Sequence, residues 1–138
     1  MTGVGVVSAL GGGVERNLAS LREGASGISQ HPTLLKTSHR LPVGEPNMSN
    51  EELHHLLGIS THEHLSRTAL LGILAVREAL QNVDMSNPTR IGLVSSTSVG
   101  GMDLTEHFFE DFIEDERAGR LRDVRMHDCA ASTEAIAR

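Results

Sequence analysis

The sequence contains neither tryptophan nor tyrosine and only three phenylalanines, so aliphatic side chains must supply most of its core. Its one cysteine cannot form an internal disulfide, and nothing in the cysteine content indicates an oxidising compartment. No apolar run approaches the roughly 18 residues of a membrane-spanning helix, and no stretch has the pattern of a signal peptide. We therefore expect no membrane association and a cytoplasmic location.

Basic residues are also scarce. Twelve lysines plus arginines stand against 18 aspartates plus glutamates, and the formal net charge is −6. Non-specific binding of nucleic acids needs a basic surface that neutralises phosphates. The composition therefore argues against a nucleic-acid partner.

The first part of the chain predicts one helix followed by a long irregular segment. Apolar residues recur at i, i+4 and i+7 from Val14 to Leu21, which predicts a helix over 14–23 that Gly24 ends in a left-handed cap. Residues 25–61 mix serine, proline, histidine and glycine with little periodicity. This composition predicts loops and short strand pieces.

The second part predicts longer elements. Residues 65–81 form a helical pattern that is apolar almost all round, as in a helix buried inside a large protein. Residues 91–95 are apolar enough for a strand buried on both faces. Residues 103–116 predict an amphipathic acidic helix, and Asp128 suits the N-cap of a final helix.

Three segments, taken in order, carry a family resemblance. They are TGVGVVSALGGG at 2–13, SRTALLGILAVREAL at 66–80 and RIGLVSSTSVGGM at 90–102. The first is a glycine-broken strand that runs into a helix, the second a long core helix, and the third a strand that leads to a Gly-Gly turn. Together they resemble β-ketoacyl-acyl-carrier-protein synthases, the condensing enzymes of fatty-acid and polyketide assembly.

The resemblance implies an α/β chain, the N-terminal part of a thiolase-like layered αβαβα fold that is incomplete here. Residues 1–138 are then an N-terminal fragment of the first ketosynthase half. The family elongates acyl chains by decarboxylative Claisen condensation with malonyl-carrier protein. It also implies an acyl carrier protein as partner, a homodimer or a ketosynthase-like partner subunit, and no metal or organic cofactor.

The resemblance assigns a substrate-binding wall rather than catalytic groups. Val99 lines or gates the acyl-chain tunnel, beside the turn formed by Gly100 and Gly101. Residues 122–126 reach across the dimer towards the partner's pocket. The nucleophilic cysteine and the two catalytic histidines are expected beyond Arg138, so this chain alone is expected to be inactive.

Cys129 is the one thiol that could serve as a nucleophile within the chain. The family nucleophile lies in a strand-to-helix turn of the type T-A-C-S/A-S, whereas Cys129 lies in HDCAASTEAIA, which looks like the helix that precedes it. Free cysteines are commonly buried as small apolar residues. We therefore expect Cys129 to be structural.

Two alternatives stay open. The first is a non-catalytic ketosynthase-like subunit of the chain-length-factor kind, which keeps the fold but lacks the nucleophile. The second is a small cysteine acyltransferase that uses Cys129 with His127. This second alternative predicts a compact fold with Cys129 exposed in a cleft near His127.

Four histidines and one glycine pair invite other interpretations. No zinc-site spacing includes His54, His55, His62 and His64, so we expect solvated loop histidines. The run from Gly3 lacks the third glycine of a dinucleotide-binding turn. Related synthases carry lysine or arginine before the long helix to grip the acidic carrier protein, but this chain has histidines there, so the carrier-docking position stays open.

Overall fold

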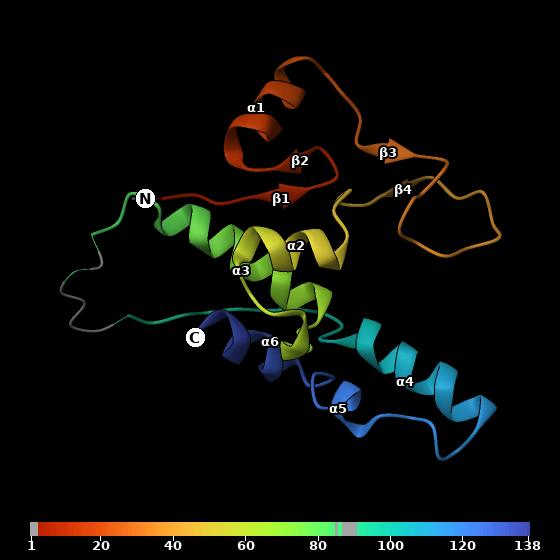
Figure 1. Cartoon of the computed structure of the whole chain (residues 1–138). Coiled ribbons are helices and arrows are strands. Elements are labelled where there is room, and N and C mark those ends of the chain that lie inside the picture. Colours follow the sequence, from red (N-terminus) through yellow and green to blue (C-terminus); the bar gives the residue numbers. More distant parts are fainter. Residues whose placement is uncertain (1–2, 85, 87–90) are drawn as a thin grey trace.

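The structure, a computed structural model, describes residues 3–84, 86 and 91–138 (Figure 1). It mixes helices with two small antiparallel sheets, which confirms the α/β expectation at this coarse level. In chain order the elements are β1 (Val7–Ser8), β2 (Gly11–Gly12), α1 (Val14–Arg22), β3 (Ile28–Ser29), β4 (Val43–Gly44), α2 (Asn50–Leu57), the 3₁₀ turn η1 (Thr61–Glu63), α3 (Arg67–Leu80), α4 (Met102–Glu114), α5 (Leu121–Val124) and α6 (Cys129–Ile136).

The core lies where α2, α3 and α6 meet (Figure 1). Its buried apolar side chains are Leu53, Leu57, Leu65, Ala69, Leu70, Ile73 and Ala135. Gly72 allows α6 to approach closely, because a Cβ at this position would lie 2.5 Å from Cδ1 of Ile136. The predicted long helix is confirmed as α3, and its apolar character is explained by packing on two sides.

The N-terminal segment packs backbone to backbone on α3. A Cβ at Gly3 or Gly5 would overlap the carbonyl oxygens of Ala79 and Ala75, so only glycine permits this contact. The glycines of this run therefore serve close packing against α3. The carboxylate of Glu78 then accepts hydrogen bonds from two backbone N–H groups of this segment.

The β1–β2 hairpin is held to α1 by one side chain. Asn17 is buried, and its Nδ2 donates to the carbonyl oxygens of Gly11 and Gly13, each at 2.8 Å. The hydroxyl of Ser8 donates to Oδ1 of the same amide at 2.5 Å. In the hairpin, Val7 of β1 pairs with Gly12 of β2. The hydrogen bonds of the buried Asn17 amide fix this hairpin against α1.

Helix α1 forms as predicted, and Gly24 follows it with a left-handed φ of 66°. The apolar residues that predicted this helix stay largely uncovered, since Leu18 and Leu21 are 42% and 65% exposed. Helix α2 was not predicted: it lies within 25–61, where loops and strand pieces were expected. None of the helices in the described part of the chain is both long and apolar enough to cross a membrane.

The strand predicted over 91–95 is absent from the structure. These residues form no ladder, and Ile91 and Val94 are 62% and 100% exposed. A strand is stabilised by hydrogen bonds to a neighbour, and the described part of the chain places none beside this segment. The strand prediction is therefore wrong for the chain as it folds here.

Candidate functional site

The Gly100–Gly101 turn lies against the backbone that leads into α6. The hydroxyl of Thr97 accepts hydrogen bonds from the N–H groups of Val99 and Gly100, and Gly100 has a left-handed φ of 57°. A Cβ at Gly100 would lie 2.5 Å from the carbonyl oxygen of His127. Two of the predicted site residues therefore meet the segment that precedes Cys129.

Gly101 makes the tighter of the two contacts. A Cβ at this position would overlap the carbonyl oxygen of Met126. Gly100 and Gly101 are both buried. No side chain fits between these two backbones, so glycine is required here on steric grounds. Val99, the predicted tunnel residue, lies beside this contact and is 50% exposed in the chain.

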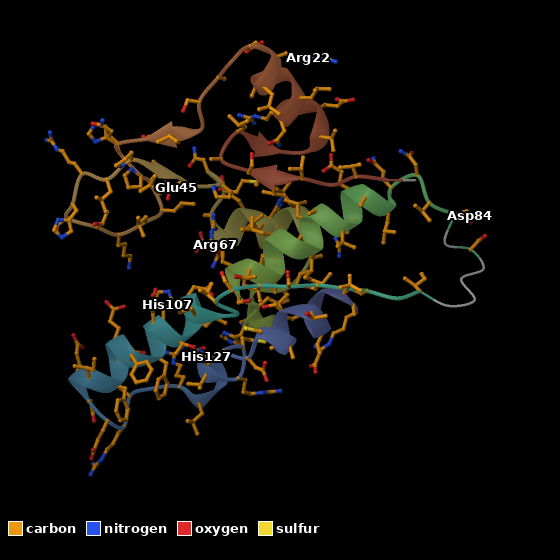
Figure 2. All side chains as sticks on the ribbon, turned by 180° about the vertical axis from the view of Figure 1, so that it is seen from behind. Arg22, Glu45, Arg67, Asp84, His107 and His127 are labelled. Atoms are coloured by element: carbon orange, nitrogen blue, oxygen red, sulfur yellow. The ribbon has the colours of Figure 1, made fainter. Side chains whose placement is uncertain are left out.

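A side chain of α4 also stabilises the contact between the Gly100–Gly101 turn and the residues that precede α6. The hydroxyl of Thr105, which is buried, lies 3.0 Å from Nδ1 of His127 and 3.5 Å from the carbonyl oxygen of Gly101. Figure 2 shows His127 below the long helix, next to the start of α4. Thr105 therefore fixes one nitrogen of the imidazole and links α4 to the turn before α6.

Cys129 is exposed, although free cysteines are commonly buried as small apolar residues. It occupies the first position of α6, after Asp128, whose carboxylate accepts the N–H of Ala130 at 2.8 Å as the predicted N-cap. The side chains of α6 that enter the core are Ser132 and Ala135, later in the helix. In the residues that the structure describes, the thiol makes no hydrogen bond to His127.

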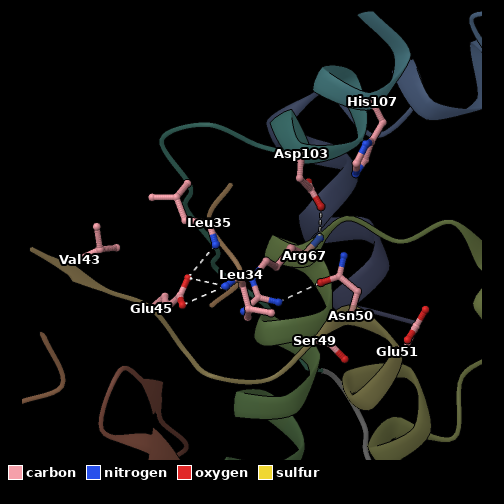
Figure 3. Close-up of a pocket in the computed structure, with 10 residues that line it drawn as sticks. All are labelled: Leu34, Leu35, Val43, Glu45, Ser49, Asn50, Glu51, Arg67, Asp103 and His107. Atoms are coloured by element: carbon pink, nitrogen blue, oxygen red, sulfur yellow. Dashed lines mark hydrogen bonds between the residues drawn. The ribbon is translucent and has the colours of Figure 1, made fainter. Parts of the chain in front are cut away.

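A hollow of about 600 Å³ lies where the starts of α3 and α4 face the loop before α2 (Figure 3). Arg67 organises it. Its guanidinium donates to the carbonyl oxygens of Pro46 and Met48 at 2.8 and 2.7 Å and to Oδ1 of Asn50 at 3.0 Å. Its backbone N–H donates to Oδ2 of Asp103 at 2.8 Å, so α4 is tied to the first turn of α3.

Glu45 closes the far side of this hollow. Partial burial raises the pKa of Glu45, but hydrogen bonds from the N–H groups of Leu34, Thr33 and Leu35 lower it more, so its pKa lies below the ordinary value. Figures 2 and 3 show Arg67 between the loop that carries Glu45 and the helix that carries His107. The hydrogen bonds of Arg67 therefore tie the loop before α2, the start of α3 and the start of α4 together, as in a structural joint.

The four histidines proposed as solvated loop residues have different surroundings. His54 and His55 lie in α2, and His54 is buried with its Nδ1 3.2 Å from the carbonyl oxygen of Ile59, so the loop expectation is wrong for this pair. His62 lies in η1, and His64 follows it with a left-handed φ of 45°. Among the described residues, no group of three histidine, cysteine or acidic side chains could hold a metal ion.

Three features of these sites were missed in the sequence. The contact of Arg67 with Asp103 joins residues 36 apart and leaves no local signal. The bond of Thr105 to His127 joins residues 22 apart and likewise leaves no local signal. Helix α2 did have a signal, because Ser49 and Glu52 form a capping box of the S-x-x-E type.

No protein-family model matches the chain, and no curated protein matches it either.

Proposed function

We propose that the chain is the N-terminal portion of a β-ketoacyl-acyl-carrier-protein synthase with a thiolase-like layered αβαβα fold. The observation that carries the proposal is the contact of Gly100 and Gly101 with residues 126–129. This contact brings the Gly-Gly turn of the resemblance against Met126, the last residue of the predicted pocket segment 122–126, and against the three residues that follow it.

The exposed apolar surface supports the proposal that further polypeptide completes the fold. Ile91, Leu93 and Val94 lie close together in the sequence, and all three side chains are exposed. A parallel strand of this composition is normally covered on both faces. In the proposed full-length protein this segment pairs within a central sheet. Leu18 and Leu21 on α1 offer a second uncovered apolar face.

The complete protein would elongate acyl chains on acyl carrier protein. An enzyme cysteine accepts the acyl group as a thioester, malonyl-carrier protein loses CO₂, and the resulting carbanion attacks the thioester carbon and releases the thiolate. The cysteine and the two histidines of this sequence of steps belong to polypeptide after Arg138. Val99, Gly100 and Gly101 supply part of the pocket wall, and the protein works as a homodimer or beside a ketosynthase-like subunit.

The proposal is tested by reading the coding sequence after Arg138 and assaying its product. We expect a T-A-C-S-type turn followed by two histidine motifs, and a β-ketoacyl product from acyl- and malonyl-carrier protein. The 138-residue chain alone should yield none. A glutamine in place of the cysteine would instead identify a non-catalytic chain-length-factor subunit, and an unrelated downstream sequence would refute the proposal.

One observation favours the cysteine acyltransferase as a second candidate. Cys129 is exposed at the first position of an eight-residue helix, two residues from His127. In this reaction His127 takes the proton of Cys129, and the thiolate attacks the carbonyl carbon of an acyl thioester. A new thioester forms on Cys129, and the carrier leaves as a thiolate that takes up the proton from His127. Mass spectrometry after incubation with acyl-carrier protein tests it: an acyl adduct absent from Cys129→Ala supports the candidate, and an unmodified chain refutes it.

A further inference from the structure

Another hollow, of about 400 Å³, opens between η1, α5 and α6. Its lining gathers five basic side chains from segments far apart in the sequence: His62, His64, Arg122, Arg125 and Arg138. The chain as a whole carries a net charge of −6. Arginines and histidines therefore gather around one hollow, although acidic residues outnumber lysines and arginines in the chain as a whole.

Among the described residues, the arginines that line this hollow keep their guanidinium N–H donors free of hydrogen bonds to the protein. Arg67 and Arg77, in contrast, direct their guanidiniums at backbone carbonyl oxygens and serve the fold. In the part of the chain that the structure describes, the guanidiniums of the hollow donate no hydrogen bond to a protein group, and that of Arg122 only approaches Asp123, with Nε 3.9 Å from Oδ1. Guanidinium groups with free N–H donors, gathered around one hollow, suit an oxyanion, because each guanidinium can donate two parallel hydrogen bonds to it.

The charge of the hollow depends on its histidines. The titratable and charged groups that face it are His62 and Glu63 from η1, His64 after it, Arg122 and Asp123 from α5, Arg125 after it, Glu134 from α6 and Arg138 beyond its end. Guanidiniums and carboxylates are equal in number. Protonation of the histidines therefore decides whether the hollow is neutral or positive.

His64 connects this charge to the fold. Its backbone is left-handed, with φ of 45°, and its Nδ1 lies 3.9 Å from Oδ1 of Asp123, the carboxylate that Arg122 also approaches. A protonated imidazole at this position competes with Arg122 for Asp123. The guanidinium is then more available to a ligand.

We propose that this hollow binds a tetrahedral oxyanion of the sulfate or phosphate class, and binds it more tightly as His62 and His64 take up protons. Histidine is the side chain that ordinarily changes charge between about pH 5 and 8. The inference rests on this cluster alone and is independent of the condensing activity proposed above.

The test is an NMR titration of the 138-residue chain with sodium sulfate at constant ionic strength. Sulfate keeps its two charges over this range, so any pH dependence belongs to the protein. We expect saturable shifts of the amides of 61–64, 122–126 and 134–138, with affinity about three- to tenfold higher near pH 6 than near pH 8. Dimethyl phosphate serves as a second probe: binding of both ions indicates that esterified phosphate is accepted, and binding of sulfate alone indicates a free dianion.

Matched variants separate the two parts of the inference. His62→Gln with His64→Asn should abolish the pH dependence, and asparagine tolerates the left-handed backbone at the second position. Arg122→Gln with Arg125→Gln should weaken binding about tenfold or more at both pH values. His31→Gln with His39→Gln, two exposed histidines elsewhere, should change neither. Shifts that do not saturate, or a pH dependence that survives in the first double variant, would overturn the inference.

Discussion

The carboxylate of Glu78 in α3 accepts a hydrogen bond of 2.6 Å from the backbone N–H of Val14, the first residue of α1. Its other oxygen accepts from the N–H of Val6 at 2.9 Å. The N-cap position before α1 is Gly13, which offers no side-chain cap. A side chain 64 residues away therefore does the work of the cap and joins the N-terminal hairpin to the core helix.

Replacement of Glu78 by alanine should lower the free energy of unfolding by about 1 to 3 kcal/mol, because two backbone donors lose a charged acceptor. Glu78→Gln should cost less, since one carbonyl oxygen can still accept. Urea unfolding followed by circular dichroism measures both. Glu106→Gln, on the exposed surface of α4, is the control, and an equal loss there would argue against the capping role.

Substitution of Gly101 by alanine should destabilise the chain by about 2 kcal/mol or more, because the new Cβ overlaps the carbonyl oxygen of Met126. The matched change is Gly92→Ala, where nothing lies within 4 Å, and it should stay within about 0.5 kcal/mol of the parent. Thermal unfolding of the two variants gives the comparison. Equal stabilities would mean that the turn does not contact residues 126–129 in solution.

The sequence predicted four helices of this fold because each has an apolar pattern or a cap of its own. It did not predict how their faces are covered: Leu18 and Leu21 form the expected stripe on α1, yet Asn17 is the residue buried there. The strand at Ile91 failed for a related reason, since strands depend on neighbours that local pattern does not supply. Helix α2 was overlooked because histidines and a proline-containing lead-in masked the capping box at Ser49.

The candidate site was predictable only in part. The Gly100–Gly101 pair is visible in the sequence, but its partner, the carbonyl of Met126, is 25 residues further on and carries no side-chain signal. The sequence also did not predict that Cys129 is exposed. Which side chains of the short helix α6 face the core depends on where α6 packs on α3, and this packing is not visible in the local sequence.

Glu45 should make stability depend on pH. Because its pKa is lowered in the folded chain, its contribution is present above the unfolded value of about 4.5 and is lost as the pH falls through the lower folded value. Glu45→Gln should therefore be less stable than the parent at neutral pH, and the difference should shrink as the pH falls through the lowered pKa of folded Glu45. Unfolding curves at a series of pH values from neutral to acid measure this. A difference that stays constant would show that the backbone donors of 33–35 do not hold the carboxylate.

In the proposed full-length synthase, Val99→Phe should shorten the accepted acyl chain, because added volume at a tunnel wall has nowhere to relax in a close-packed interior. The change should leave the stability of the 138-residue chain within about 0.5 kcal/mol, since Val99 is half-exposed there. Product chain lengths are read by mass spectrometry beside Ile113→Phe, a distant exposed position. An unchanged product profile would remove Val99 from the pocket wall.

Sedimentation velocity of the purified 138-residue chain tests most directly whether it is one portion of a larger condensing fold. Its exposed apolar residues, at 91–94 and on α1, lack cover, and such surfaces associate in water. We predict dimers or larger species at micromolar concentration, and a shift towards monomer when Val94 is replaced by lysine. A cooperative, stable monomer of the unaltered chain would contradict the account and identify a complete small domain.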